Sequence, residues 1–343
     1  MDILFRIFSE VVSNFMNRSD NATVQAFASY LPEKVLTNDD LSKVVDTSDE
    51  WIVTRTGIRE RRIASDDQHT STMGALAAQK LLKETKMDPL DIDLIIVTTM
   101  TPDYLCPSTA ALIQSTLGAT NAAAFDLEAA CSGFIYGLAT AKAFVESGTY
   151  SSILLISSEK NSSFIDYTDR NTCILFGDGA GACLIKKGGS GLRIGHCYLG
   201  ASGKEADLIT IPAGGSRLPH AKEKNPQHAL HMNGKEVFKH AVRKMEESME
   251  ICLKKANVPP SQVRWFIPHQ ANQRIIESAA KRFGIPKEKT VITIDRFANT
   301  SAATIPVALD LLWQNNQIAP GDNLLLAAVG GGLTWGASLL QAT

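Results

Sequence analysis

Two long stretches of the chain repeat the same alternation of helical and strand-like hydrophobic patterns. In the first, apolar residues at helical spacing over 72–86 end near a proline and lead into an unbroken apolar run at 94–97. In the second, helical spacing over 235–256 ends at a Pro-Pro pair and leads into a similar run at 263–267. Short apolar runs of this kind predict buried strands, so each stretch predicts a helix followed by a strand.

The repeat continues beyond these strands. In each half a further helix, a strand, a turn and another helix follow one another. In the first half the helix is predicted at 107–117, the strand at 123–127 and the turn at 131–133, with the second helix directly after the turn. In the second half the helix is predicted at 271–284, the strand at 291–294 and the turn at 299–301, again with a helix directly after the turn. Each half then closes with a strand, at 153–157 or 323–328, a glycine-rich turn and a last strand. Strands alternating with helices are typical of mostly parallel sheets covered on both faces.

The duplication divides the chain into three parts. We predict an N-terminal half at 22–190, a C-terminal half at 191–343 and an extension at 1–21. The extension has apolar residues at helical spacing, which is typical of a packing helix, but an alternative start or a disordered tail also fits. It lacks the consecutive apolar core of a signal peptide. In two packed halves, the equivalent turns at Cys131 and Asn299 would lie at the edges where α/β proteins bind ligands.

Composition and charge narrow the class of protein. With 343 residues, 44% hydrophobic and 20% charged, the chain has the balance of a globular protein with a large core. The formal net charge of −2 gives no overall attraction to nucleic acid or acidic membranes. Six cysteines without CxxC spacing argue against a metal site and a disulfide framework, and favour a cytoplasmic location. No apolar run approaches the ~18 residues needed to span a bilayer.

Cys131 is the candidate nucleophile. It lies between a predicted strand and an Ala- and Gly-rich helix. The N–H groups at a helix N-terminus favour the thiolate over the thiol, and the thiolate is the form that attacks a carbonyl. A cysteine in an Ala-rich stretch is more often a small buried apolar residue, and the other five cysteines are interpreted that way. The turn position and the equivalent Asn299 favour the nucleophile for Cys131.

His269 and Asn299 complete a set of three polar residues at such turns. His269 directly follows a predicted strand. Alone, it would be interpreted as a structural histidine, and Asn299 as a helix cap. Together with Cys131 they can act on a thioester carbonyl, because the Asn299 amide can donate a hydrogen bond to an oxyanion or enolate. The glycines at 330–332 offer unobstructed backbone N–H groups for the same purpose, whereas those at 177–181 are interpreted as a tight hairpin without chemistry.

Five ordered motifs closely resemble the β-ketoacyl-acyl-carrier-protein synthase III family of the thiolase superfamily. The resemblance runs from about Ser29 to the carboxyl terminus. The motifs are Asp-Thr-Ser-Asp-Glu-Trp-Ile with Thr-Arg-Thr-Gly-Ile at 46–58, the cysteine segment at 129–134, Pro-His-Gln-Ala-Asn at 268–272, Asn-Thr-Ser-Ala-Ala at 299–303 and Gly-Gly-Gly-Leu-Thr-Trp-Gly at 330–336. The resemblance implies a homodimer with a thiolase-like fold, in which two duplicated α/β halves form an α-β-α-β-α layered architecture.

The resemblance also implies the chemistry. Acetyl-CoA would acylate Cys131, and malonyl-acyl-carrier-protein would then lose carbon dioxide and attack this thioester in a decarboxylative Claisen reaction that initiates type II fatty acid synthesis. His269 and Asn299 would stabilise the malonyl-derived enolate, and the N–H groups of Cys131 and Gly331 would form the oxyanion hole. No cofactor is implied, because the coenzyme A thioester is a substrate.

Two binding surfaces follow from the same resemblance. Coenzyme A would be held by Trp51 and Arg170 stacking on its adenine, by Arg55 near its phosphate and by Asn272 near its pantetheine, with Phe238 as a further contact. The acyl carrier protein would bind a basic patch. This patch consists of Lys239, Arg274, Lys281 and Arg282. From the residues alone, Trp51 is a partly buried surface aromatic and the patch is a solvated helical face.

Several positions depart from the family's pattern. Cys106 and Val329 stand in the implied acyl pocket where familiar members have larger aromatic residues, so primers longer than acetyl are expected beside acetyl-CoA. Ala298 replaces a glycine before Asn299. Glu128 is unusual before the nucleophile and is expected to point outward. None of these changes removes a reacting group.

Two other functions compete with this one. A related condensing or acyl-transfer enzyme of polyketide or quinolone type would keep Cys131 but relax the basic patch. A catalytically silent acyl-CoA-binding partner subunit would not need Cys131, His269 and Asn299, so the intact set argues against it. The sequence leaves open the preferred primer length, the physiological acceptor and the role of residues 1–20.

Overall fold

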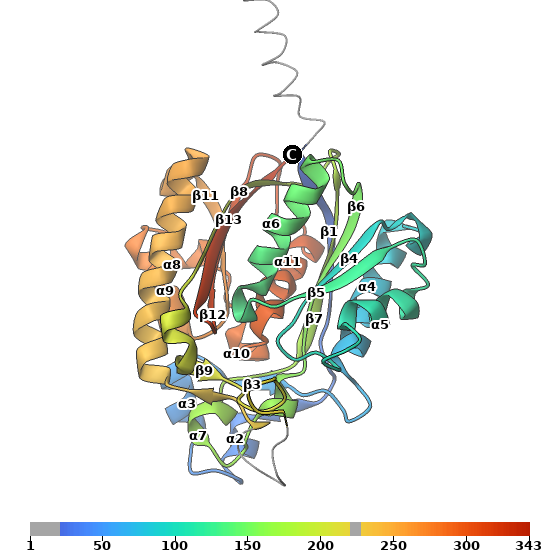
Figure 1. Cartoon of the computed structure of the whole chain (residues 1–343). Coiled ribbons are helices and arrows are strands. Elements are labelled where there is room, and N and C mark those ends of the chain that lie inside the picture. Colours follow the sequence, from blue (N-terminus) through green and yellow to red (C-terminus); the bar gives the residue numbers. More distant parts are fainter. Residues whose placement is uncertain (1–20, 220–227) are drawn as a thin grey trace, which may run out of the picture.

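The strands of both halves join one nine-stranded sheet in the computed structural model, which describes residues 21–219 and 228–343 (Figure 1). The strand order is β11-β12-β13-β8-β1-β7-β6-β4-β5. The first half supplies β1 (Ala22–Tyr30), β4 (Leu94–Thr98), β5 (Ala123–Leu127), β6 (Ser152–Glu159) and β7 (Gly179–Lys187). The second half supplies β8 (Leu192–Ala201), β11 (Val263–Pro268), β12 (Asn323–Gly330) and β13 (Thr334–Ala342).

The strand order repeats between the halves, which confirms the predicted duplication. The order β11-β12-β13-β8 matches β4-β6-β7-β1 strand for strand. Directions match too, because β4–β6 and β11–β12 are parallel while the remaining neighbours in both series are antiparallel. The sheet is therefore mixed rather than mostly parallel.

The boundary predicted between residues 190 and 191 stays a prediction, and its place between β7 and β8 supports it.

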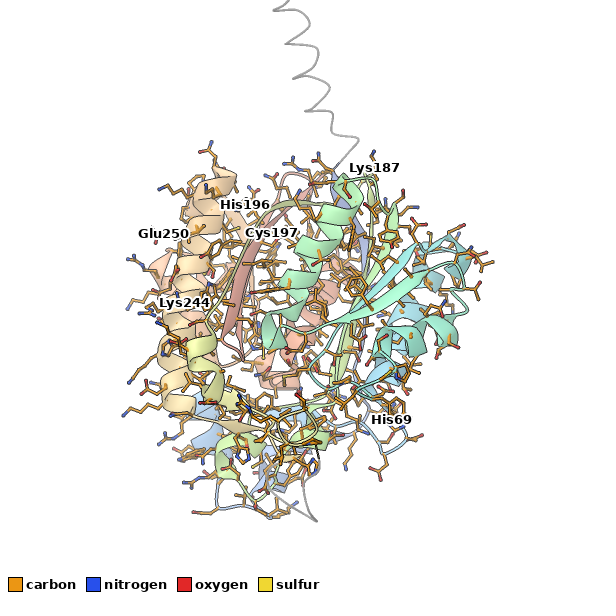
Figure 2. All side chains as sticks on the ribbon, viewed as in Figure 1. His69, Lys187, His196, Cys197, Lys244 and Glu250 are labelled. Carbon is orange, nitrogen blue, oxygen red and sulfur yellow. The ribbon has the colours of Figure 1, made fainter. Side chains whose placement is uncertain are left out.

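Helices form three layers around the two parts of the sheet (Figure 1). The middle layer is α6 (Gly133–Glu146) and α11 (Thr304–Gln314), and the outer layers are α4 (Thr70–Thr85) with α5 (Thr109–Leu117) and α8 (Gly234–Ala256) with α9 (Gln273–Arg282). One cluster of buried apolar side chains surrounds the middle layer, and each outer layer packs on the sheet through a cluster of its own. Lys244 lies on α8 (Figure 2). Its ammonium lies 4.2 Å from the ring centroid of Trp335 in β13, so it also contacts the sheet. The layers confirm the α-β-α-β-α architecture.

The predicted strand at 291–294 is wrong. This segment pairs with β11 only through an isolated bridge at Thr290 and then enters the short helix α10 (Ile294–Phe297). The side chain of Gln270 takes the place of a neighbouring strand, since it donates to one backbone carbonyl of the segment and accepts from two of its N–H groups. Hydrophobic periodicity cannot reveal that a distant side chain satisfies these backbone groups.

The predicted tight hairpin at 177–181 is also wrong. β6 and β7 are antiparallel neighbours, but the connection between them contains the helix α7 (Arg170–Cys173), and Gly179 and Gly181 lie within β7. A Cβ atom added to Gly181 would lie 2.7 Å from the side chain of Pro306 in α11. The glycine therefore permits close packing of β7 on the middle layer rather than a turn.

The extension predicted at 1–21 lies, apart from Asn21, outside the described residues. Its helical interpretation therefore stays a prediction. Within the two described ranges, no helix combines the length and the apolar character that crossing a membrane requires.

Candidate active site

A cavity of about 100 Å³ is lined by residues of both halves. Its walls include Cys131, His269 and Asn299, so the structure brings together the three residues that the sequence singled out. The other walls are mostly apolar and include Met100 and Phe238. An apolar cavity with a few convergent polar groups is the usual form of a small-molecule site.

Cys131 lies in the short turn η3 (Ala130–Ser132), which leads into α6. Ala130 has a left-handed φ of 45°, and Oε1 of the exposed Glu128 accepts the Ala130 N–H at 2.9 Å and so supports the turn. Burial raises the pKa of the Cys131 thiol to about 12. The resting group is therefore a thiol, because burial outweighs the effect of the helix N-terminus on which the sequence prediction of a thiolate relied.

His269 follows β11 and is held through its backbone and its ring. The backbone N–H donates to the carbonyl of Ala327 at 2.8 Å, and Nδ1 lies 2.7 Å from the hydroxyl oxygen of Thr304. With Nδ1 engaged, Nε2 is the ring nitrogen left for a substrate. Burial lowers the pKa of His269 to about 3, so the imidazole is neutral at neutral pH. A neutral ring can form a hydrogen bond but supplies no positive charge to a thiolate.

Asn299 is oriented by its own backbone neighbours. Its Oδ1 accepts the N–H of Ser301 at 2.8 Å, and its backbone N–H donates to the carbonyl of Leu175 at 2.9 Å. Because Oδ1 is occupied, Nδ2 is the atom available to donate into the cavity, as stabilisation of an enolate requires. Ala298, the departure noted in the sequence, has φ 54° and ψ −153°, a conformation that favours glycine.

The glycine-rich turn after β12 approaches Cys131 closely. A Cβ atom added to Gly330 would lie 2.6 Å from the backbone nitrogen of Cys131, so only glycine permits this approach. Gly331 lines the cavity directly. The turn thus packs against the backbone of the candidate nucleophile, which is the arrangement that an oxyanion hole between Cys131 and Gly331 needs.

Two supporting residues were missed in the sequence. Ser301 holds Asn299 through its N–H, and its carbonyl oxygen accepts the hydroxyl of Thr304 at 3.0 Å. Thr304 in turn contacts His269. Both residues lie in or directly after the Asn-Thr-Ser-Ala-Ala motif, and a cluster of hydroxyl residues entering an apolar helix was the signal that could have revealed them.

Trp51, in α3 (Asp49–Thr56), is flanked by the two arginines predicted to bind coenzyme A. The guanidinium carbons of Arg55 and Arg170 lie 4.6 and 4.9 Å from its ring centroid. Nη1 of Arg170 also donates to the backbone carbonyl of Asp46 at 2.9 Å. A purine between Trp51 and Arg170 needs about 7 Å, twice an optimal carbon contact, so its insertion requires Arg170 to swing away.

Asn272 and Phe238 both line the cavity. The side chain of Asn272 is engaged within the protein, because Oδ1 accepts the N–H of Arg274 at 2.9 Å and Nδ2 donates to the carbonyl of Arg55 at 3.0 Å. The ring centroid of Phe238 lies 5.7 Å from the guanidinium carbon of Arg274. These contacts link α3, which carries Trp51, to the wall of the cavity.

Comparison with known proteins identifies the family. Two models described as 3-oxoacyl-[acyl-carrier-protein (ACP)] synthase III match the chain, one at residues 125–203 and one for the C-terminal part at 253–342. The β-ketoacyl-[acyl-carrier-protein] synthase III of Chlamydia pneumoniae is 51% identical, over 95% of this chain and 98% of its own. The chain belongs to the β-ketoacyl-[acyl-carrier-protein] synthase III family. It is therefore a condensing acyltransferase, as predicted.

Solved structures agree with this membership of the synthase III family. The 3-oxoacyl-[acyl-carrier-protein] synthase III of Aquifex aeolicus VF5 has a TM-score of 0.86 and 45% identity, over 93% of this chain and 99% of that chain. The priming β-ketosynthase of the R1128 polyketide pathway has the same TM-score but 33% identity, over 94% and 97%. The greater similarity to synthase III favours that role over the polyketide-type alternative.

The two acyl-pocket positions of this synthase III lie in different surroundings. Val329, in β12, is 7% exposed and lines the cavity. Cys106 is exposed and does not line the cavity within the described part of the chain. Its neighbours Tyr104 and Leu105 are also exposed. Within one chain, the geometry supports the acyl-pocket assignment for Val329 and not for Cys106.

The basic patch lies on the outer helices α8 and α9, where all four of its residues are exposed. Arg274 is in the first turn of α9, beside the cavity wall at Phe238. Lys281 and Arg282 are in the last turn, about 11 Å further along the helix. Nζ of Lys239 lies 2.7 Å from Oε1 of Glu236, so its charge is partly balanced. Arg274 is therefore the patch residue best placed to act near the cavity.

Proposed function

We propose that this synthase III transfers an acyl group from acyl-CoA to Cys131 and condenses it with malonyl-acyl-carrier-protein. The convergence of Cys131, His269 and Asn299 on one apolar cavity carries the proposal. The acyl carrier protein in the names of the relatives supports the choice of partner. The reaction initiates type II fatty acid synthesis.

In the first half-reaction, Sγ of Cys131 loses its proton and attacks the carbonyl carbon of the acyl-CoA. The carbon–sulfur bond to coenzyme A breaks, and the overall transfer leaves the proton on the released coenzyme A thiol. The N–H groups of Cys131 and Gly331 stabilise the oxyanion of the tetrahedral intermediate. The close packing of Gly330 against Cys131 supports this geometry. A covalent acyl-enzyme predicts ping-pong kinetics.

In the second half-reaction, the malonyl group loses carbon dioxide, and the electrons of the broken carbon–carbon bond form an enolate. The enolate carbon attacks the acyl-Cys131 carbonyl and expels the thiolate. Nε2 of His269 and Nδ2 of Asn299 donate hydrogen bonds to the enolate oxygen, and the lowered pKa of His269 supports a neutral donor. The scheme is complete without a resident cofactor, because the coenzyme A thioester is a substrate.

Coenzyme A enters along the residues around Trp51. Its adenine stacks between Trp51 and Arg170 after Arg170 swings away, and its phosphate lies near Arg55. Pantetheine passes Asn272 and Phe238 toward the thiol. The acidic surface of the carrier protein docks on the basic patch.

The edge strand β5 supports a homodimer. β5 pairs with β4 on one side and is the last strand of the sheet, so no strand of the described ranges pairs with its other edge. None of its residues is buried, although it includes Phe125 and Leu127. Such an edge is a template for pairing with a second copy, and we place the dimer contact there. The predicted cytoplasmic location is supported by six free cysteines.

Intact-mass spectrometry tests the proposal. Wild type mixed with acetyl-CoA should gain one acetyl group, Cys131→Ser should gain none, and malonyl-acyl-carrier-protein should discharge the adduct to a β-ketoacyl product. An adduct that malonyl-acyl-carrier-protein cannot discharge would support the polyketide or quinolone alternative. A wild type that forms no adduct would support a silent acyl-CoA-binding subunit.

A further inference from the structure

Arg61 is a fully buried cation that the proposed chemistry does not use. It lies in β3 (Glu60–Arg62), and within the described ranges the acceptors of its hydrogen bonds are all neutral oxygens. Burial lowers the pKa of Arg61 to about 10, so the guanidinium still carries its charge at neutral pH. A buried charge is costly unless its N–H groups find acceptors, so the positions of these acceptors indicate what the residue organises.

The acceptors of this guanidinium come from three segments of the chain. Nη1 donates to the carbonyl of Leu36, in β2 (Val35–Thr37), at 3.0 Å. Nη1 and Nη2 both donate to Oδ1 of Asn38, in α2 (Asn38–Leu41), at 3.0 Å. Nη2 also donates to the carbonyl of Ile174, directly after α7, at 2.9 Å. The planar guanidinium presents its N–H groups as a rigid fork, so it fixes these segments relative to one another.

Asn38 links the guanidinium to both ends of α3. Its Nδ2 donates to Oδ1 of Asp49, the first residue of this helix, at 2.8 Å. The same Nδ2 donates to the carbonyl of Ile58, two residues beyond the end of the helix, also at 2.8 Å. The helix between these two contacts carries Trp51, on which the adenine of coenzyme A is proposed to stack. One buried amide thus holds the whole of α3 in place.

Ile174 links the guanidinium to a segment that serves both the coenzyme A site and the catalytic cavity. The segment begins at Arg170, which lies against Trp51. Directly after Ile174, the carbonyl of Leu175 accepts the N–H of Asn299 at 2.9 Å, and Leu175 lines the cavity. The N–H of Gly177 then donates to the carbonyl of Asn299 at 3.1 Å. The contact with the guanidinium therefore lies between the residue that covers the adenine site and the residues that hold Asn299.

The packing around Arg61 joins these segments further. The elements α2, α3, α7 and β3 gather at one end of the molecule, at the bottom of Figure 1, and α2, α3, α7 and α10 share one cluster of buried apolar side chains. A Cβ atom added to Gly177 would lie 3.1 Å from Cβ of Arg61. The backbone N–H of Arg59 donates to the carbonyl of Asp295, in α10, at 3.0 Å. A change at Arg61 is therefore expected to shift both α3 and the residues around Asn299.

We propose that Arg61 positions the coenzyme A site and Asn299 relative to one another, because it holds α3 through Asn38 and the backbone next to Asn299 through the carbonyl of Ile174. The inference rests on the proposed function and adds a residue on which both half-reactions depend. Arg61 does not line the catalytic cavity within the described ranges, so it is a positioning residue.

Arg61→Lys tests the proposal, because an ammonium on a flexible stem does not reproduce the rigid fork. The KM for acetyl-CoA should rise about tenfold, and carbon dioxide release from malonyl-acyl-carrier-protein should slow about tenfold. Acylation of Cys131 by acetylpantetheine, which lacks the adenine nucleotide, should change by less than about twofold. Equal losses in all three measurements would indicate general destabilisation and would overturn the inference.

Asp49 separates the two links. Asp49→Ala removes the acceptor at the start of α3, so the KM for acetyl-CoA should rise about tenfold while carbon dioxide release changes by less than about twofold. Asp49→Asn keeps an Oδ1 that accepts from Asn38, and it should restore the wild-type KM. If Arg61→Lys does not fold, this pair decides, and an unchanged KM in Asp49→Ala overturns the inference.

Arg62→Lys is the matched control. Arg62 is the next residue of β3, and its Nη1 donates to the carbonyls of Pro32 and Glu33 at 3.4 Å, so this variant should keep the wild-type values. Folded Arg61→Lys with the wild-type KM and the wild-type rate of carbon dioxide release overturns the inference. A wild type without an adduct on Cys131 defeats the proposed function, whereas a wild-type adduct with unchanged constants in Arg61→Lys defeats this inference alone.

Discussion

The hydroxyl oxygen of Thr304 lies 2.7 Å from Nδ1 of His269 and 3.0 Å from the carbonyl oxygen of Ser301. The hydroxyl has one proton to donate. If it donates to Nδ1, the proton of the neutral imidazole is on Nε2, and only then can His269 donate a hydrogen bond to an enolate. The proposed decarboxylation therefore requires the Thr304 proton to turn from the Ser301 carbonyl to Nδ1 of His269.

Thr304→Val should slow decarboxylation of malonyl-acyl-carrier-protein by about 10- to 100-fold, because the ring loses the partner that fixes its tautomer. Acylation of Cys131 should change by less than about twofold, since it does not use His269 as a donor. Thr304→Ser should restore both rates. Carbon dioxide release and acyl-enzyme formation, measured separately, provide the check, and an equal loss in both half-reactions would contradict the assignment.

Acid should destabilise the fold through His269. Its pKa is about 3 in the folded chain and near 6.5 when unfolded, so the unfolded state binds the extra proton between these values and stability falls as the pH drops below 6.5. At pH 5 the loss amounts to about 2 kcal/mol. Urea unfolding at pH 7.5 and pH 5 measures this loss in both wild type and His269→Gln. Between these two pH values, the free energy of unfolding of wild type should fall by about 2 kcal/mol more than that of His269→Gln. Identical pH dependence in the two proteins would refute it.

Ala298→Gly should raise the free energy of unfolding by about 1 kcal/mol, because φ 54° and ψ −153° strain an L side chain and suit glycine. Ala303→Gly is the control, since Ala303 has φ −75°. That variant should lose about 1 kcal/mol, as glycine does at ordinary helical angles. Denaturant midpoints measure both, and a destabilised Ala298→Gly would show that the position is not strained.

Val329→Phe should shorten the preferred primer, because added volume in the cavity wall excludes longer acyl chains. Wild type should accept butyryl-CoA beside acetyl-CoA, and the variant should lower the butyryl-to-acetyl ratio of turnover about tenfold. Cys106→Phe should leave the ratio unchanged if Cys106 acts within one chain, where it is exposed. An equal shift in both variants would mean that a second chain brings Cys106 to the cavity.

Arg274→Glu should raise the apparent KM for malonyl-acyl-carrier-protein and leave that for acetyl-CoA nearly unchanged. The effect should become milder as salt rises, because a rim charge acts on an acidic partner through a field screened over about 10 Å at 0.1 M salt. Arg264→Glu is the matched control, since Arg264 lies at the opposite end of β11 from His269. Equal changes for both substrates would instead assign Arg274 to coenzyme A.

The sequence allowed the duplicated halves and the convergence of Cys131, His269 and Asn299 to be predicted, because strand ends and turns leave local patterns. It did not allow the support of the site to be predicted. Gln270 replaces a strand and Ser301 joins Asn299 to Thr304 through contacts that depend on where side chains meet in three dimensions. The protonation of Cys131 was missed for the same reason, since burial is a property of the packed structure and not of a turn.

The middle layer has a consequence for how the two halves share the chemistry. It is built from α6 and α11, one helix from each half, and these helices begin just after Cys131 and Asn299 (Figure 1). A single half alone would expose the apolar face of its helix to water, so a free-standing half would need a second copy to cover that face. Cys131 and Asn299 stand at equivalent places in the two halves, so joining the halves in one chain lets a single position of the repeat carry two different reacting groups.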